Sequence, residues 1–168
     1  TNHKPIIGEA EQLEYDLVVI TADNASPMTF TGTRTYVLGT ENLIIIDPGP
    51  DSAAHLSSIM KYIGKRKVTD ILLTHSHIDH SPLSRRLKTE TGARIIGFGS
   101  ADEARTSFMK KLSSSLDLGG EEGIDKDLAL DKKVVEKQML KLNNYSIEVV
   151  HTPGHLSNHI CFSLKERK

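Results

Sequence analysis

Residues 71–80 read ILLTHSHIDH. The three apolar residues Ile71–Leu73 favour a short buried strand. Four side chains that can bind a metal ion follow at once: His75, His77, Asp79 and His80. Because alternate residues of an extended segment point to the same side, the imidazoles of His75 and His77 can hold one ion. Imidazole binds zinc, iron and related metals, so this stretch predicts a metal site at the end of a strand.

A solvated polar loop is the alternative interpretation of this stretch, and the neighbouring sequence argues against it. The apolar run Leu43–Ile46 stops at the turn formed by residues 47–50, DPGP, as expected of a strand buried on both faces. Ser81 and Pro82 fit an N-cap and a first helical residue. A loop between a buried strand and a capped helix lies where binding sites form in layered folds.

Strands and helices alternate along the first part of the chain. The predicted strands are residues 17–21, 35–39, 43–46, 71–73, 94–98, 138–142, 146–150 and 160–164. The predicted helices are residues 52–63, capped by Asp51 or Ser52 and ended by Gly64, 82–91, ended by Gly92, and 101–118. Residues 119–123, GGEEG, form an acidic connection. The alternation predicts an α/β layered fold.

A second histidine cluster follows the predicted strand 146–150. Residues 151–159 read HTPGHLSNH, and this cluster and residues 74–80 together hold six of the eight histidines. Because ligand sites form at strand ends in α/β folds, we expect the two clusters to meet.

The length of 168 residues suits one domain, and the shares of hydrophobic residues (38%) and charged residues (26%) are ordinary for a globular protein. A formal net charge of -1 gives no general attraction to nucleic acid or anionic membrane. The single cysteine, Cys161, fits a reducing cytoplasm. No apolar run reaches the roughly 20 residues that cross a bilayer. We therefore predict a cytoplasmic protein without a membrane span.

The pattern His75-x-His77-x-Asp79-His80 resembles the H-x-H-x-D-H signature of the metallo-β-lactamase superfamily. The turn at residues 47–49 and the segment Thr152-Pro153-Gly154-His155 also match, in the family's order. Relatives of this broad kind include glyoxalase II-type thioesterases and metal-dependent ribonucleases. The resemblance covers residues from about 30 to 164 and implies a four-layer αββα sandwich, two sheets face to face with helices outside.

The resemblance also implies a site for two divalent metal ions, zinc in the first place, with manganese or iron as alternatives. His75, His77 and His155 resemble the ligands of the first ion, and Asp79 and His80 those of the second. The family's mechanism uses a metal-bound hydroxide as the nucleophile. Asp79 is the implied catalytic residue, which orients that water or accepts its proton.

Other residues carry weaker expectations. Asp47 either accepts a hydrogen bond from a ligand imidazole or is a plain turn residue before Pro48. His151 is expected to be structural, and a role for His159 in the site stays open. His3 and His55 are expected at the surface, and Cys161 is expected to be a small buried hydrophobe.

Two elements of the family's pattern do not appear in this sequence. The pattern needs a bridging aspartate after the Pro-Gly-His segment and a later histidine, but no aspartate follows Asp131 and no histidine follows His159. We therefore expect residues 1–168 to be one domain truncated at its C-terminus, with an incomplete second half. Open strand edges and apolar surface favour association, so we expect a homodimer.

The leading functional hypothesis is a metal-dependent hydrolase of a small-molecule ester, thioester, amide or phosphodiester. One alternative is an oxidoreductase with one iron held by His75, His77 and an aspartate. Another is a catalytically inactive fragment. Nucleic acid is not favoured as a partner, because the basic clusters at residues 65–67, 85–88 and 110–111 are more simply solvated helix faces or loops.

Overall fold

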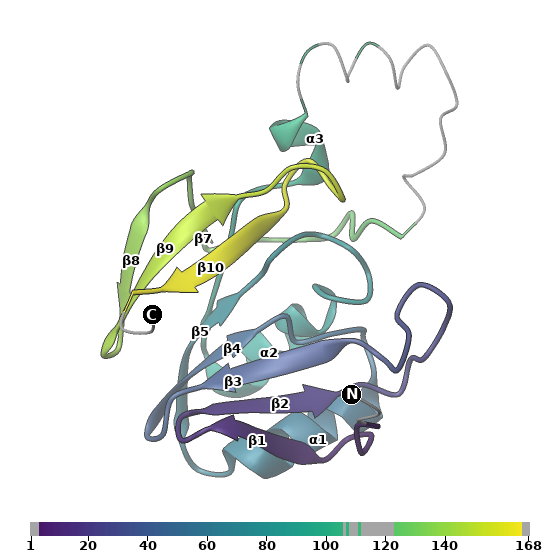
Figure 1. Ribbon diagram of the computed structural model, residues 1–168, viewed down its shortest axis with the longest axis vertical. Helices are drawn as coiled ribbons and strands as arrows, with labels where there is room; N and C mark the ends of the chain where they lie inside the picture. Colours follow the sequence, from purple (N-terminus) through teal and green to yellow (C-terminus); the bar gives the residue numbers. More distant parts are fainter. Residues whose placement is uncertain (1–3, 106, 108–110, 112–122, 166–168) are drawn as a thin grey trace.

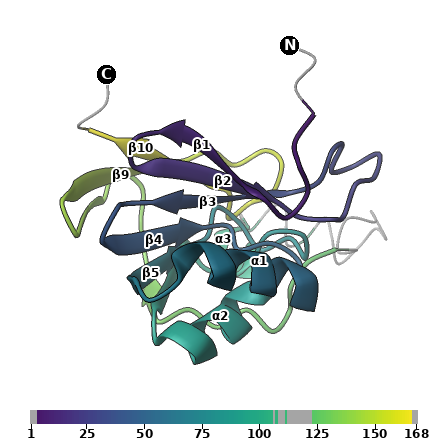
Figure 2. The same cartoon turned by 90° about the horizontal axis from the view of Figure 1, so that it is seen from below.

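Two β-sheets face each other, and two helices cover the outer side of the larger sheet (Figure 1, Figure 2). The computed structural model describes residues 4–105, 107, 111 and 123–165. The strands are β1 (Ala10–Glu14), β2 (Leu17–Thr21), β3 (Arg34–Leu38), β4 (Asn42–Ile46), β5 (Lys67–Leu72), β6 (Arg94–Gly97), β7 (Lys132–Lys133), β8 (Met139–Leu142), β9 (Tyr145–His151) and β10 (Ile160–Leu164). The helices are α1 (Ala53–Ile63), α2 (Leu83–Thr91) and α3 (Ala101–Ala104).

The larger sheet has seven strands, and its spatial order β1-β2-β3-β4-β5-β6-β7 is the order of the sequence. Strands β1 to β4 pair antiparallel, and β4 to β7 pair parallel. Parallel neighbours need a crossover, which α1 provides between β4 and β5 and α2 between β5 and β6. The carboxyl ends of β4 and β5 therefore lie side by side.

The larger sheet is apolar on both faces, which confirms the prediction for Leu43–Ile46. Leu43 and Ile45 belong to a core that also contains Leu56 and Ile59 of α1. Ile44 points the other way, into a second core shared with β8, β9 and β10. A continuous apolar strand is expected where both faces are covered.

The helix boundaries follow local signals with one exception. Ser52 caps α1 through a hydrogen bond from the backbone N–H of His55 at 3.3 Å, and Gly64 ends the helix. Gly92 ends α2 in the left-handed region, as predicted. The prediction that Ser81 caps α2 was wrong, because Pro82 is the N-cap and makes no side-chain cap bond.

Some elements were missed or misplaced by the sequence analysis. Strand β1 was not predicted, since its residues AEQLE lie at an exposed edge without an apolar face. Strand β5 begins four residues earlier than predicted, at Lys67, and the two-residue β7 was missed. Of the predicted helix 101–118, α3 is described as Ala101–Ala104, and most of the remainder and residues 119–122 lie outside the described residues.

The smaller sheet has the order β10-β9-β8, all antiparallel. The described residues thus form one helical layer, a seven-stranded sheet and a three-stranded sheet (Figure 2). In this part of the chain, no helix is long and apolar enough to span a membrane.

Two predictions about single residues were wrong. His55 is buried with 3% exposure, because α1 turns it toward the sheet, where its Nε2 lies 2.8 Å from Thr35 Oγ1. Cys161 is exposed, because it alternates with the inward-facing Ile160 on β10. His3 lies outside the described residues.

Candidate metal centre

Three loops at one end of the two sheets build the candidate centre. They follow β4, β5 and β9, and backbone hydrogen bonds join them. The N–H of Asp47 donates to Leu72 O at 2.9 Å, and that of Ile160 donates to Thr74 O at 2.9 Å. The N–H of Gly49 donates to His80 O, also at 2.9 Å. Segments about 80 residues apart in sequence are therefore held together before any ligand is considered.

The structure brings together His75, His77 and His155, the three predicted ligands of the first ion. One ring nitrogen of each lies within 4.8 Å of the others. The ring centroids are 4.8 Å apart for His75 and His77, 4.6 Å for His77 and His155, and 5.1 Å for His75 and His155. Three imidazoles this close form a donor set suited to zinc or a related cation.

The hydrogen bonds of Thr74 determine which nitrogen of His75 carries the proton. Thr74 Oγ1 lies 2.7 Å from Asp47 Oδ2 and 2.8 Å from His75 Nδ1. An ionised carboxylate only accepts, so the hydroxyl proton goes to Asp47 and His75 Nδ1–H donates to Thr74. The lone pair of His75 therefore lies on Nε2, which is buried and has no hydrogen-bond partner. A buried nitrogen lone pair without a partner fits a metal ligand.

Asp47 is hydrogen-bonded to the histidine loop, residues 74–80, as one of its two predicted interpretations requires. Its Oδ1 accepts a hydrogen bond from Thr74 N at 2.8 Å, and its Oδ2 lies 3.0 Å from His80 Nδ1. Its backbone has φ of 49°, in the left-handed region that non-glycine residues rarely adopt. Strained conformations of this kind are concentrated at functional sites.

Asp79 and His80, the predicted ligands of the second ion, lie next to each other. His80 Nε2 is 3.2 Å from Asp79 Oδ2, and Thr33 Oγ1 donates to the same oxygen at 3.0 Å. Burial would raise the pKa of Asp79, but the hydrogen bonds from His80 and Thr33 hold it well below its usual range. Asp79 is therefore ionised at neutral pH.

The imidazoles titrate differently according to their neighbours. Burial, with the nearby His80, lowers the pKa of His75 to about 2. Burial would also lower the pKa of His80, but its hydrogen bonds to Asp47 and Asp79 raise it to about 9. Burial lowers the pKa of His77. His75 is thus held neutral, the form that binds metal.

The two remaining histidines of the second cluster differ in position. His151 stacks on Phe98 with ring centroids 4.3 Å apart, and its Nε2 lies 2.8 Å from Ser157 O, so its contacts are structural. His159 lies beside the cluster, with its ring 5.0 Å from that of His75 and its Nδ1 2.7 Å from Thr152 Oγ1.

Supporting residues were missed by the sequence analysis. Asn158 is buried and donates to Ser76 Oγ at 3.1 Å and to Gly99 O at 2.7 Å. Asp125 accepts from Ser81 Oγ at 2.9 Å and from Arg85, and its N–H donates to Ser76 O. Both residues are hydrogen-bonded to the histidine loop, Asn158 at Ser76 and Asp125 at Ser76 and Ser81. Asn158 lies within the second histidine cluster and Asp125 has no such motif around it, but neither contact could be read from the sequence, since each joins segments more than 40 residues apart.

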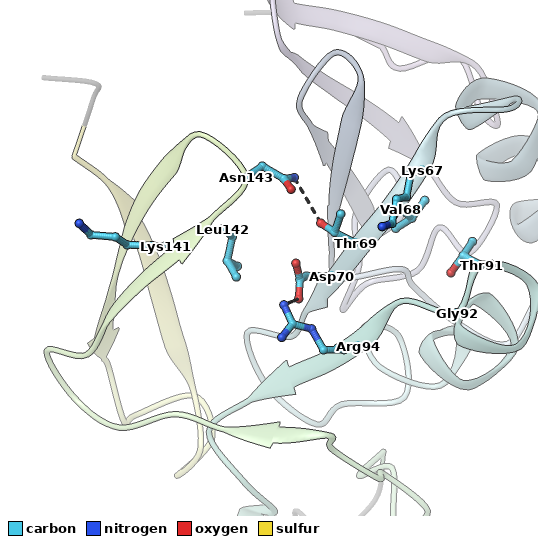
Figure 3. A pocket seen from close by; sticks show the side chains of 10 residues that line it. All are labelled: Lys67, Val68, Thr69, Asp70, Thr91, Gly92, Arg94, Lys141, Leu142 and Asn143. Atoms are coloured by element: carbon cyan, nitrogen blue, oxygen red, sulfur yellow. Dashed lines mark hydrogen bonds and ion pairs between the residues drawn. The ribbon is translucent and has the colours of Figure 1, made fainter.

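A cavity of about 410 Å³ lies at the other end of β5 (Figure 3). It is lined by residues from Lys67–Asp70 and by Arg94 and Asn143, among others. Buried Asp70 faces Arg94 there, with Oδ1 and Nη2 2.6 Å apart. None of the predicted site residues lines this cavity.

The comparison with known families agrees with this geometry. A family model described as the metallo-beta-lactamase superfamily matches residues 28–168. The chain belongs to the metallo-beta-lactamase superfamily. The matched residues include the turn at Asp47, the histidine loop 74–80 and His155, so the resemblance seen in the sequence is confirmed.

Superfamily members of two kinds are similar to this chain in sequence. The hydroxyacylglutathione hydrolase GloC of Haemophilus influenzae is 30% identical over 128 residues, covering 76% of this chain and 58% of that protein. The atrochrysone carboxyl ACP thioesterase dmxR1 of Cryptosporiopsis sp. is 26% identical over 170 residues, covering 98% of this chain and 44% of that protein. The chain thus spans about half the length of these superfamily relatives.

A solved structure of the superfamily shows the same fold. The metallo-beta-lactamase of Cronobacter sakazakii superposes with a TM-score of 0.70 at 21% identity, covering 93% of this chain and 59% of that one. The predicted fold, a metallo-β-lactamase sandwich with an incomplete second half, is therefore confirmed.

Proposed function

We propose that this protein is a metal-dependent hydrolase that acts on a small thioester or ester. The observation that carries the proposal is the buried, unpartnered Nε2 of His75, which lies with His77 and His155 in one group of close ring nitrogens. A buried polar atom without a partner is costly, and a bound cation would relieve that cost.

The residues divide into two proposed sets. His75, His77 and His155 would hold a first divalent ion. Asp79 and His80, which contact each other, would contribute to a second. A bound ion supplies Lewis acidity and lowers the pKa of a coordinated water to roughly 7. Asp79, ionised and partly exposed beside His80, would orient that water and accept its proton.

Zinc is the proposed metal, with manganese or iron as alternatives. The first set consists of nitrogen donors only, which favours zinc over hard cations that prefer oxygen. The mononuclear iron alternative requires an aspartate beside His75 and His77. In the part of the chain that the structure describes, the aspartate found in a group of three close ligand atoms is Asp47, with His75 and His80 and without His77, which counts against that alternative.

The substrate class is proposed from the relatives together with the site. Of the relatives named above, one is a thioesterase by name and the other a hydroxyacylglutathione hydrolase. The metal chemistry of a three-histidine set suits attack on an activated carbonyl. We place this protein, with a small-molecule acyl substrate, in the same class.

Nucleic acid is disfavoured as a substrate by the charges of α2. Its three cations are paired with carboxylates: Arg85 with Asp125, Arg86 with Asp51, and Lys88 with Asp131. Arg66 stacks over the ring of Tyr62 at 4.5 Å. Lys110 lies outside the described residues. Cations that are already paired contribute little to a phosphate-binding groove, so α2 does not provide one.

Metal content tests the proposal. This chain and the complete natural protein are loaded with zinc, desalted and analysed for metal by elemental analysis. We expect two ions in the complete protein and at least one in this chain, because the three-histidine set lies within residues 75–155. Hydrolysis of a generic thioester such as an acyl-thiocholine, followed with a thiol reagent, is measured on the same samples. Failure of both proteins to retain zinc would contradict the assignment.

A further inference from the structure

We propose that Thr33 and Asn24 are positioning residues that fix the carboxylate of Asp79 for its metal. This inference rests on the proposed function, because it concerns the second ion. Thr33 and Asn24 lie in the segment between β2 and β3, and Asp79 lies 46 residues further along, after β5. The sequence gives no sign of this contact.

The backbone of Thr33 is held in place from two sides. Its carbonyl accepts a hydrogen bond from the N–H of Ala22 at 2.9 Å, and its N–H donates to Asn24 Oδ1 at 2.8 Å. The preceding Gly32 has φ of 115°, and a Cβ there would lie 2.2 Å from Ala22 O. Only glycine fits at that position, so the chain must return to β3 with Thr33 in this place.

The amide of Asn24 has a determined orientation. Its oxygen must face the N–H of Thr33, because two donors cannot face each other. Its nitrogen, Nδ2, therefore faces Thr33 Oγ1 and donates to it at 3.0 Å. The side chain of Asn24 is therefore hydrogen-bonded to Thr33 twice, as donor to its hydroxyl oxygen and as acceptor from its backbone N–H.

The direction of the last hydrogen bond follows from proton counting. A threonine hydroxyl has one proton. Since Asn24 Nδ2–H already points at Thr33 Oγ1, and since the carboxylate can only accept, the hydroxyl proton goes to Asp79 Oδ2, 3.0 Å away. Thr33 is buried with 5% exposure, so water competes little for this bond. Asn24 and Thr33 together present one fixed donor to Asp79.

The consequence is a carboxylate with restricted rotation. The side-chain contacts of Asp79 described above, from Thr33 and from His80 Nε2 at 3.2 Å, both go to Oδ2. If His80 Nε2 bound a metal ion instead of Asp79, Thr33 would be the donor that still orients the carboxylate of Asp79. Mutating a residue that orients a metal-binding side chain typically lowers the metal affinity 10–100-fold.

Cobalt binding tests this inference on the 168-residue chain and on the complete protein. Thr33→Val removes the hydroxyl at nearly constant volume, and Thr33→Ser restores it. Thr21→Val is the matched control, because Thr21 is a neighbouring buried threonine whose hydroxyl has no partner. Cobalt affinities are measured by chelator competition, and the ligand-field absorption bands report the geometry of each ion.

We expect Thr33→Val to weaken binding of the second cobalt about 10-fold and to change its absorption bands, with the first cobalt unaffected. Thr33→Ser and Thr21→Val should behave like the wild type. In metal-free protein, the carboxyl carbon resonance of Asp79 should shift in Thr33→Val and not in Thr21→Val. Unchanged second-ion affinity and an unchanged resonance in Thr33→Val would overturn the inference. A wild type that binds no cobalt would overturn the proposed function itself.

Discussion

Replacing His75 with alanine is expected to abolish specific metal binding by this chain. His75 is central to the cluster, with rings of His77, His80, His155 and His159 all within 5.1 Å of its own. Its Nε2 is the buried atom whose lone pair is left for a cation. Loss of a ligand should weaken binding by more than about 100-fold, since supporting residues alone contribute 10–100-fold.

Thermal unfolding with and without zinc measures the loss. A ligand that binds only the folded protein stabilises it by about 2.7 kcal/mol at 100 times its Kd. Zinc should therefore raise the Tm of the wild type and leave that of His75→Ala unchanged. His151→Gln is the control, because His151 stacks on Phe98 outside the ligand group, and it should respond to zinc like the wild type. An equal zinc response in His75→Ala would contradict the assignment.

Protonation of His55 should contribute to a loss of stability in mild acid. Burial lowers the pKa of His55 from 6.5 to about 4. The folded value lies below the unfolded one, so protons bind preferentially to the unfolded chain. The contribution of His55 is present in full above pH 6.5 and is lost as the pH falls toward 4. The full difference corresponds to about 3 kcal/mol of unfolding free energy.

The free energy of unfolding, measured with urea at pH 7 and pH 4.5 for the wild type and for a His55 variant, checks this contribution. His55→Gln keeps a polar group near Thr35 but does not titrate. Other groups lose stability in acid in both proteins, so the quantity of interest is the difference between their losses. The wild type should lose about 2 to 3 kcal/mol more than His55→Gln. Equal losses would mean that His55 does not control the acid sensitivity.

The parts of the fold that could be predicted are those with local causes. The strand Leu43–Ile46 and the helix stop at Gly92 follow from an apolar run and from a residue that tolerates the left-handed region. Strand β1 could not be found in this way, because it is an exposed edge whose pairing with β2 depends on backbone hydrogen bonds and not on an apolar face.

The candidate site divides along the same line. His75, His77, Asp79 and His80 are neighbours in sequence, and their spacing alone indicates a chelating loop. Their roles as ligands, like that of His155, stay predictions that the metal measurements test. The contacts of Thr33 and Asp125 with this loop could not be foreseen, since they join segments more than 40 residues apart. The burial of His55 was missed because the sequence of a short helix does not show whether a single histidine lies on its buried or its exposed face.

The strictly sequential order of the larger sheet has a consequence for how the protein forms. Each strand from β1 to β7 pairs with the strands just before and after it in the chain, so the sheet can grow by adding strands at one edge. Contacts between near neighbours in sequence form early, and distant ones form late. His155 joins His75 across a long stretch of chain, so the centre should be the last part to assemble. Pulse-labelled hydrogen exchange during refolding should protect the amides paired within each sheet before the N–H of Ile160, which donates to Thr74 O across that stretch. A newly made molecule would then bind its metal only after the two sheets have formed and packed together.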